Sequence, residues 1–152
     1  MTAADFAPAA ITRVLGIACG QGLNIECDVA NTLEYRPKHL CNLVIMCYTH
    51  LPADERATVL ANAAAGLATE GTLLCIGTAA SDQSWEDELR HLLVMPDEIV
   101  AELPDLAIER AEVIRRKMPH PEDADCEGDG LIVQARRVGD TRAVTESAGR
   151  HQ

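Results

Sequence analysis

Residues 42–52 read NLVIMCYTHLP, residues 72–77 read TLLCIG, and an alanine-rich segment at 53–68 separates them. Both runs are short and apolar, without polar alternation, which is typical of strands covered on both faces in a parallel sheet. In the segment between them, apolar residues recur on one helical face: Val59, Leu60, Ala63, Ala64 and Leu67. This pattern predicts a βαβ unit with a right-handed crossover.

The sequence also marks the ends of this helix and predicts its packing. Pro52 suits the start of a helix, and Gly71 stands where a left-handed residue often follows the end of one. We expect four strand residues to be fully buried under the helix: Val44, Ile45, Leu74 and Ile76. Replacing Ile45 or Leu60 with Ala is then expected to cost about 2–5 kcal/mol.

The other expected elements are segments bounded by Gly, Pro or polar residues. Before the βαβ unit we expect a helix that starts at Pro8 and stops at Gly20 and Gly22, then a strand at 23–29 that alternates apolar and polar residues. After it we expect two short helices and then two strands, at 85–93, 97–103, 106–117 and 131–138. The acidic segment 122–129 is expected to join the two strands as a long hairpin.

Length and composition bound the class of protein. The 152 residues suit one α/β domain, which we place at 1–138, with a disordered tail at 139–152 that has little to bury. The net charge of −11 argues against nucleic acid and anionic membranes as partners. No apolar stretch approaches the roughly 20 residues of a membrane span. The N-terminus also lacks a basic region followed by an apolar leader, so we expect a cytoplasmic protein.

Six cysteines are spread along the chain without a Cys-x-x-Cys pair. Cys27, Cys47 and Cys75 lie within apolar runs, so buried free thiols are the favoured interpretation. A zinc site or a disulfide framework is the alternative. The four histidines other than His50 show no metal-ligand spacing, and we place them on the surface.

Polar residues follow three expected strands at their carboxyl ends, where open α/β sheets bind ligands. They are Asp5, Asn31 and the segment 46–52. These points resemble motifs of the class I S-adenosylmethionine-dependent methyltransferases, on the branch that includes tellurite- and thiol-type small-molecule enzymes. DFAP at 5–8 resembles the end of that family's second strand, and NLVIMCYTHLP resembles its fourth strand and "DLV … HLP" exit. Residues 67–77 resemble the run into its fifth strand, with Glu70 in place of a Gly.

The resemblance implies a Rossmann-like α/β fold, S-adenosylmethionine as the cofactor and a small-molecule methyl acceptor. It places the cofactor against six residues: Asp5, Phe6, Ala30, Asn31, Met46 and Cys47. Asp5 matches the acidic residue that holds the ribose hydroxyls, and Asn31 takes the position of an Asp that faces the adenine amino group. Tyr48 and His50 are the implied catalytic residues, with His50 as a general base or as a group that orients the nucleophile. Structural roles are the alternatives: a solvated terminus for Asp5, a turn for Asn31 and a helix-entrance contact for His50.

One motif of the family is not found at its expected place. In the family, a Gly-rich loop after the first strand approaches the methionine part of the cofactor. ACGQG at 18–22 imitates that loop, but a gap-free match to the family makes Gly20 and Gly22 a helix end instead. We therefore expect an N-terminally truncated domain that lacks the first strands of the family's order 3-2-1-4-5-7-6, and only weak binding of the cofactor.

Loss of those strands would remove the centre of the sheet. The strand at 23–29 would then pair directly with 43–48, or the apolar edge of 43–48 would find another partner, which predicts a homo-oligomer through an exposed sheet edge. Two other functions stay open beside methyl transfer. One is a non-catalytic methyltransferase remnant that acts as an interaction module or homodimer, and the other is a different nucleotide-binding α/β module.

Overall fold

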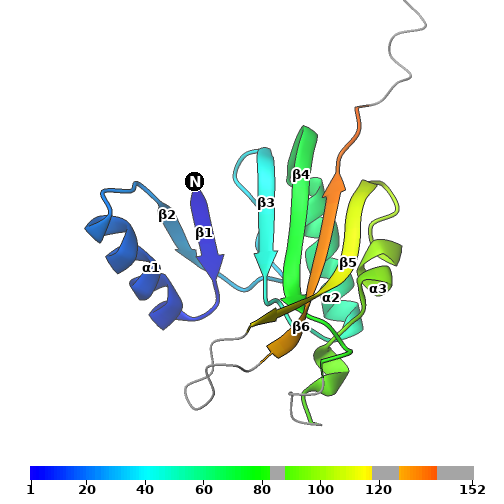
Figure 1. Ribbon diagram of the computed structural model, residues 1–152. Helices are drawn as coiled ribbons and strands as arrows, with labels where there is room; N and C mark the ends of the chain where they lie inside the picture. Colours follow the sequence, from blue (N-terminus) through cyan, green and yellow to red (C-terminus); the bar gives the residue numbers. More distant parts are fainter. Residues whose placement is uncertain (83–87, 118–126, 140–152) are drawn as a thin grey trace, which may run out of the picture. The chain divides into compact units, whose positions relative to one another are not determined.

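The computed structural model describes residues 1–82, 88–117 and 127–139 (Figure 1). The chain divides into two compact units, Met1–Arg36 and Pro37–Gln152, and each is described here by itself. The expected tail beyond residue 139 lies outside the described residues. Within the described part of the chain, no helix is long and apolar enough to cross a bilayer.

The first unit is a βαβ unit made of β1 (Thr2–Asp5), α1 (Pro8–Gly20) and β2 (Glu26–Val29). The two strands are parallel, and Asp5 at the end of β1 lies opposite Val29. α1 begins at Pro8, where the missing N–H has no helical partner to lose, and it buries Ile11 and Ala18. The helix expected from Pro8 is confirmed, and a strand does precede Asp5.

The glycines after this helix form its end. Gly22 has a φ of 66°. The N–H of Leu23 donates to the carbonyl of Ala18 at 2.8 Å, and the N–H of Gly22 donates to the carbonyl of Cys19 at 3.2 Å. This pair of bonds is a Schellman motif, whose left-handed residue costs least when it is Gly. The interpretation of this segment as a helix end is confirmed.

Two expectations for the first unit are wrong. β2 begins at Glu26 and not at residue 23, because residues 23–25 complete the turn that leaves α1. β2 also pairs with β1, whereas direct pairing with the strand at 43–48 was one of the two expected outcomes. The reason is that Thr2–Asp5 forms a strand of its own, which gives β2 a parallel partner across α1.

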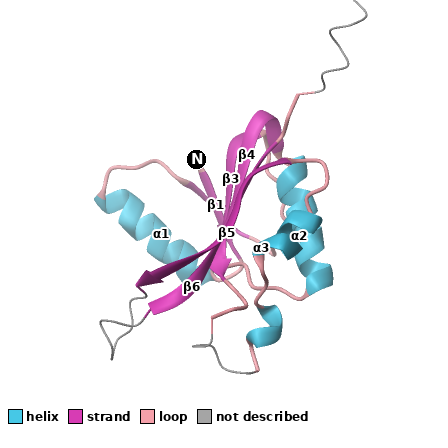
Figure 2. Cartoon of the chain, turned by 45° about the vertical axis from the view of Figure 1, so that its right-hand side comes forward, coloured by secondary structure: helices cyan, strands magenta, loops and turns pink. Residues whose placement is uncertain are grey.

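The second unit is a four-stranded sheet with two α-helices on the same side (Figure 2). Its elements in chain order are β3 (Cys41–Cys47), α2 (Ala53–Ala65), β4 (Leu67–Thr78), the short 3-10 helix η1 (Arg90–Leu92), α3 (Pro96–Ala101), β5 (Ala107–Lys117) and β6 (Glu127–Arg136). The strand order is β3-β4-β6-β5. β3 and β4 are parallel across α2, and β6 is antiparallel to both of its neighbours. The expected βαβ unit and C-terminal hairpin are confirmed.

The junction between α2 and β4 differs from the expectation. α2 ends at Ala65, β4 begins directly at Leu67, and Gly71 lies inside β4 instead of after the helix. The left-handed residue is Glu70, with a φ of 63°. A Cβ at Gly71 would lie 2.8 Å from the carbonyl oxygen of Cys41, so Gly is needed for the close approach of β3 and not for a helix end.

Three further boundaries changed or fall outside the described residues. The helix expected at 97–103 is α3, which starts at Pro96 and ends at Ala101. Of the helix expected at 85–93, η1 is described, and residues 83–87 lie outside the described part. β6 begins at Glu127, before the expected residue 131, so residues 127–129 of the acidic segment expected as a connection belong to this strand. The rest of that segment lies in 118–126, outside the described residues.

α2 and α3 cover one face of this sheet, which we call the covered face. Its central side chains are at most 4% exposed: Leu73, Cys75, Leu131, Val133 and Ala135. They pack in one cluster with Leu60 and Leu67 of the α2–β4 segment and with Ile99 of α3. This cluster is the hydrophobic core of the second unit.

The opposite face, which we call the open face, also carries aliphatic residues: Leu43, Ile45, Leu74, Ile76 and Ile132. Leu43 is 53% exposed and Ile45 is 52% exposed. The full burial expected for Val44, Ile45, Leu74 and Ile76 is therefore wrong, because Ile45 is exposed and the other three are half-buried. Successive side chains alternate between the faces of a strand, and the helices of this unit cover only one face, so Ile45, Leu74 and Ile76 lie on the open face. Val44 lies on the covered face and packs against the core, but it is only half-buried on the edge strand β3.

Candidate functional site

Four of the residues chosen from the sequence lie at the carboxyl ends of β1 and β2 in the first unit: Asp5, Phe6, Ala30 and Asn31. The N–H of Ala30 donates to the carbonyl of Asp5 at 3.0 Å, which joins the two strand ends. Oδ1 of Asp5 accepts the N–H of Ala7 at 2.7 Å, and Phe6 is 75% exposed. The structure thus brings these residues together at one edge of the parallel pair.

The contacts of Asp5 and Asn31 show what each side chain can still bind. The bond to Ala7 orients the Asp5 carboxylate at the entrance to α1 and leaves its second oxygen without a donor among the described residues. Oδ1 of Asn31 accepts the N–H of Leu33 at 3.1 Å, so the turn role considered for Asn31 is real. The Asn side chain has an oxygen with two lone pairs and an NH₂ group with two donors, so Asn31 can form further hydrogen bonds beside this turn.

The other four chosen residues belong to the second unit and lie at the end of β3 or just after it: Met46, Cys47, Tyr48 and His50. Tyr48 has a φ of 55°, a left-handed conformation that is strained for an aromatic residue. Its N–H donates to the carbonyl of Ile76 at 2.7 Å, which fixes this conformation at the end of the sheet. The rings of Tyr48 and His50 meet edge to face, with centroids 6.1 Å apart.

His50 lines a small cavity on the side of α2 and α3, together with Met46, Thr78 and Leu131. The cavity volume is about 30 Å³, which is room for about two water molecules and far below the roughly 300 Å³ of a small-molecule pocket. Burial lowers the pKa of His50 below its ordinary value, so its imidazole is neutral at pH 7. This cavity can hold water beside a neutral base, but it cannot hold a nucleotide cofactor.

Arg116 on β5 completes this group, although it was not among the residues chosen from the sequence. Its guanidinium carbon lies 5.3 Å from the centroid of the Tyr48 ring, which is a cation–π contact. In the sequence Arg116 is one of two adjacent arginines near the end of an expected strand, and such a pair usually indicates charges that face solvent. The alternation of β5 could have indicated its position, because it puts Arg116 on the same face of the sheet as Ile114 and opposite Gly128 of β6.

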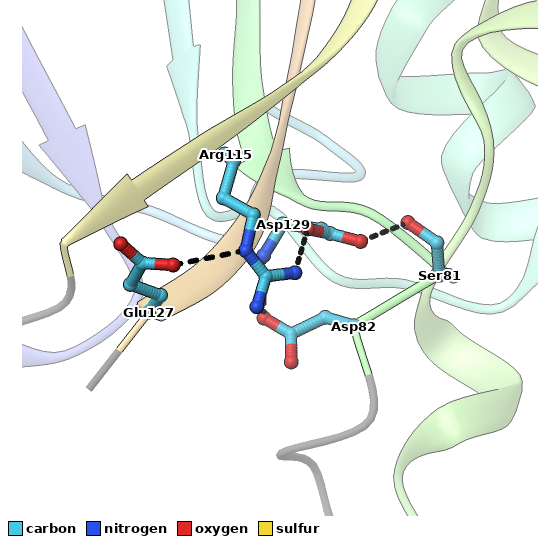
Figure 3. Close-up of polar contacts among 5 residues, drawn as sticks. All are labelled: Ser81, Asp82, Arg115, Glu127 and Asp129. Atoms are coloured by element: carbon cyan, nitrogen blue, oxygen red, sulfur yellow. Dashed lines mark hydrogen bonds and ion pairs between the residues drawn. The ribbon is translucent and has the colours of Figure 1, made fainter.

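A second polar cluster ties the segment after β4 to the β5–β6 hairpin (Figure 3). Ser81 Oγ donates to Asp129 at 2.8 Å, and the backbone N–H of Asp129 donates to the buried carboxylate of Asp82 at 3.1 Å. Arg115 bridges Glu127 and Asp129, each at 3.1 Å. No set of metal-ligating side chains occurs in the described residues, so we assign this cluster to structure.

The comparisons with known proteins concern the fold. No family model and no curated protein matches the sequence. The N-methyltransferase NodS from Bradyrhizobium japonicum WM9 has a TM-score of 0.68 at 20% identity, over 91% of this chain and 73% of NodS. TehB from Haemophilus influenzae has a TM-score of 0.72 at 10% identity, over 90% of this chain and 49% of TehB. A S-adenosylmethionine-dependent methyltransferase from Methanosarcina mazei has a TM-score of 0.67 at 15% identity, over 91% of this chain and 82% of that protein.

The chain therefore has the Rossmann-like α/β fold of these methyltransferases, and it spans about half the length of TehB. Its two sheets have the strand orders β2-β1 and β3-β4-β6-β5. β1 ends at Asp5, the residue that the resemblance places at the end of the family's second strand. A second NodS structure, in complex with S-adenosyl-L-homocysteine, has a TM-score of 0.66 to this chain at 18% identity, over 90% of this chain and 65% of NodS.

Proposed function

We propose that this protein binds S-adenosylmethionine and transfers a methyl group to a small molecule. The observation that carries the proposal is the group of polar residues at the carboxyl ends of the parallel strands, within a fold shared with methyltransferases. Bound S-adenosylmethionine would supply an electrophilic methyl group on a positively charged sulfur. The protein then has to bind, align and exclude water. Methyl transfer to a thiolate or a similar anion needs no acid–base pair, whereas a protonated thiol or amine needs a base.

The residues of the first unit suit the nucleoside part of that cofactor. The second carboxylate oxygen of Asp5 is an acceptor for a ribose hydroxyl, and the exposed ring of Phe6 offers an apolar surface. Asn31 offers both a donor and an acceptor to an adenine edge. Ala30, Met46 and Cys47 complete the proposed cofactor contacts, as the resemblance implies.

Tyr48 and His50 are the proposed catalytic residues of the second unit. Because burial keeps His50 neutral at pH 7, its imidazole can accept the proton of a thiol or amine nucleophile. The left-handed backbone of Tyr48 and its bond to Ile76 hold the ring against His50. We also propose a cytoplasmic location, as the sequence predicts.

Formation of S-adenosylhomocysteine tests this function. The whole chain is incubated with S-adenosylmethionine and a panel of small thiols and amines, and the product is measured by mass spectrometry. We expect His50→Gln to slow transfer at least about 100-fold, since a positioned general base contributes about 10²–10⁴-fold. The matched control is His91→Gln on the exposed η1 helix, which should act like the unchanged protein. Equal rates for both variants would refute the role of His50, and no product with any acceptor would refute the function.

The edge of β3 favours a second candidate, an interaction module that forms homodimers. In its sheet β3 pairs with β4 only, and residues 42–47 contain neither a charge nor a Pro to block pairing with another strand. The net charge of −11 opposes self-association, but charges are screened beyond roughly 8 Å at physiological salt. Sedimentation at micromolar concentration should show a dimer or larger species, and a monomer at all concentrations would exclude this candidate.

A further inference from the structure

Two arginines of the second unit differ in how their guanidinium groups are satisfied. Arg56 at the start of α2 donates from Nε and Nη2 to the two carboxylate oxygens of Glu102, at 3.0 and 2.7 Å. In Arg116 the same two nitrogens are shielded from solvent, and neither has a hydrogen-bond partner among the described residues. Arg56 uses these two nitrogens to bind a carboxylate. In Arg116 the same two donors have no acceptor among the described residues.

The side chain of Arg116 is held in place by its neighbours. A Cβ at Gly130 of β6 would lie 2.8 Å from Nε of Arg116, so the arginine occupies the space that any other residue there would need. The ring of Tyr48 lies 5.3 Å from the guanidinium carbon on another side. Gly130 and the left-handed Tyr48 thus bound the space that this guanidinium occupies at the end of the open face, which we call the seat of Arg116.

A second buried polar group without a partner among the described residues is a hydroxyl on β4, the strand that pairs with Gly130. Thr78 pairs with Gly130 across the β4–β6 ladder, and it is 1% exposed. Its Oγ1 has no hydrogen-bond partner among the described residues. A buried hydroxyl and a shielded guanidinium without partners each cost free energy, because both have given up hydration without a protein hydrogen bond in return.

We propose that Arg116 forms a carboxylate-binding subsite beside Tyr48. The planar fork of a guanidinium matches the two oxygens of a carboxylate, and such paired, charge-assisted bonds are stronger than neutral ones. This inference rests on the proposed function for its biological meaning: the subsite holds the carboxylate of the methyl acceptor, while the rest of the acceptor lies over Tyr48 towards His50. The acceptor is accordingly a small carboxylic acid.

The binding test uses benzoate as the probe and the ¹⁵N-labelled whole chain. Benzoate should shift the Nε–H resonance of Arg116 and the amide resonance of Gly130 in a saturable way. Benzamide, which has the same shape without the charge, should not shift them. Shifts with benzamide equal to those with benzoate, or inorganic phosphate binding as tightly as benzoate, would overturn the assignment to a carboxylate.

Variants separate this subsite from a structural role. Arg116→Gln should weaken benzoate binding about tenfold or more, and Arg116→Lys should also weaken it because it keeps the charge but lacks the fork. The control is Arg110→Gln on the same strand, which removes one charge from an arginine paired with Glu112. Unchanged binding in both Arg116 variants, or a loss of equal size in Arg110→Gln, would refute the proposal.

The outcome is independent of methyl transfer, because the titration contains no cofactor. Benzoate binding without any formation of S-adenosylhomocysteine would leave the subsite in place and refute the proposed function. Formation of S-adenosylhomocysteine without benzoate binding would refute the subsite alone.

Discussion

The two faces of the sheet in the second unit both carry aliphatic residues, but these residues differ in burial. On the covered face Leu73 is 0% exposed and Cys75 is 4% exposed, whereas Ile45 on the open face is 52% exposed. Leu73 and Leu74 are neighbours in one strand, yet only Leu73 is fully buried. The difference shows that the covered face carries the stability of this unit, while the open face, which ends at Tyr48 and Arg116, keeps apolar side chains in contact with solvent.

The largest expected effect is on the covered face. Leu73→Ala should lower the free energy of unfolding by about 2–5 kcal/mol, because it leaves a cavity in a packed core. Ile45→Ala should cost less than about 1 kcal/mol, since its side chain already contacts solvent, which revises the value expected from sequence. Urea unfolding of both variants measures the contrast. Equal losses at the two sites would show that the open face is covered in solution.

The ion pair between the two covering helices should have a smaller effect. The side chains of Arg56 and Glu102 are 10% and 21% exposed, and the hydrogen bond to Glu102 raises the pKa of Arg56. Glu102→Gln should cost about 1–3 kcal/mol, because it leaves a shielded guanidinium without its charged partner. Glu109→Gln is the matched control, since its partner Arg136 is 42% exposed and such pairs contribute about 0–1 kcal/mol. A loss from Glu109→Gln as large as that from Glu102→Gln would contradict the comparison.

The reactivity of two cysteines on adjacent strands should show the difference in solvent exposure between the two faces. Burial raises the pKa of Cys75 to about 12, while Cys47 is exposed. A thiolate-specific reagent should therefore modify Cys47 in the folded protein and leave Cys75 unmodified until unfolding. Because Cys75 stays protonated in the folded state, its contribution to stability is complete below its ordinary pKa of 9.0 and is lost as pH rises towards about 12. Mass spectrometry of the modified peptides checks the first point, and rapid labelling of Cys75 would contradict it.

The smallest expected effect comes from His50. Its pKa is lowered in the folded state, so the unfolded state binds more protons below the ordinary value of 6.5. His50 should thus leave stability unchanged above pH 6.5 and lower it as pH falls through the folded pKa. Melting temperatures of the unchanged chain and of His50→Gln between pH 7.5 and about 5 measure this. An equal decline in both would assign the acid sensitivity to other groups.

Sequence patterns identified most of the elements because they depend on local signals. Pro8 and Gly22 bound α1, and Pro96 starts α3, and these roles follow from backbone geometry alone. Burial of the open face was mispredicted, because a run such as Leu43–Cys47 does not reveal how many faces its neighbours cover. The seat of Arg116 was missed because it depends on Gly130 and Tyr48, which only the folded sheet brings next to it.

Titration of the whole chain with S-adenosylmethionine in a calorimeter tests the central claim most directly. We predict saturable binding that is weaker than low-micromolar, because Gly20 and Gly22 end a helix and do not form a cofactor loop. Asp5→Ala should abolish it, whereas Asp28→Ala on β2 should not. Absence of saturable binding by the unchanged chain would contradict the claim, and low-micromolar affinity would contradict the role assigned to the two glycines.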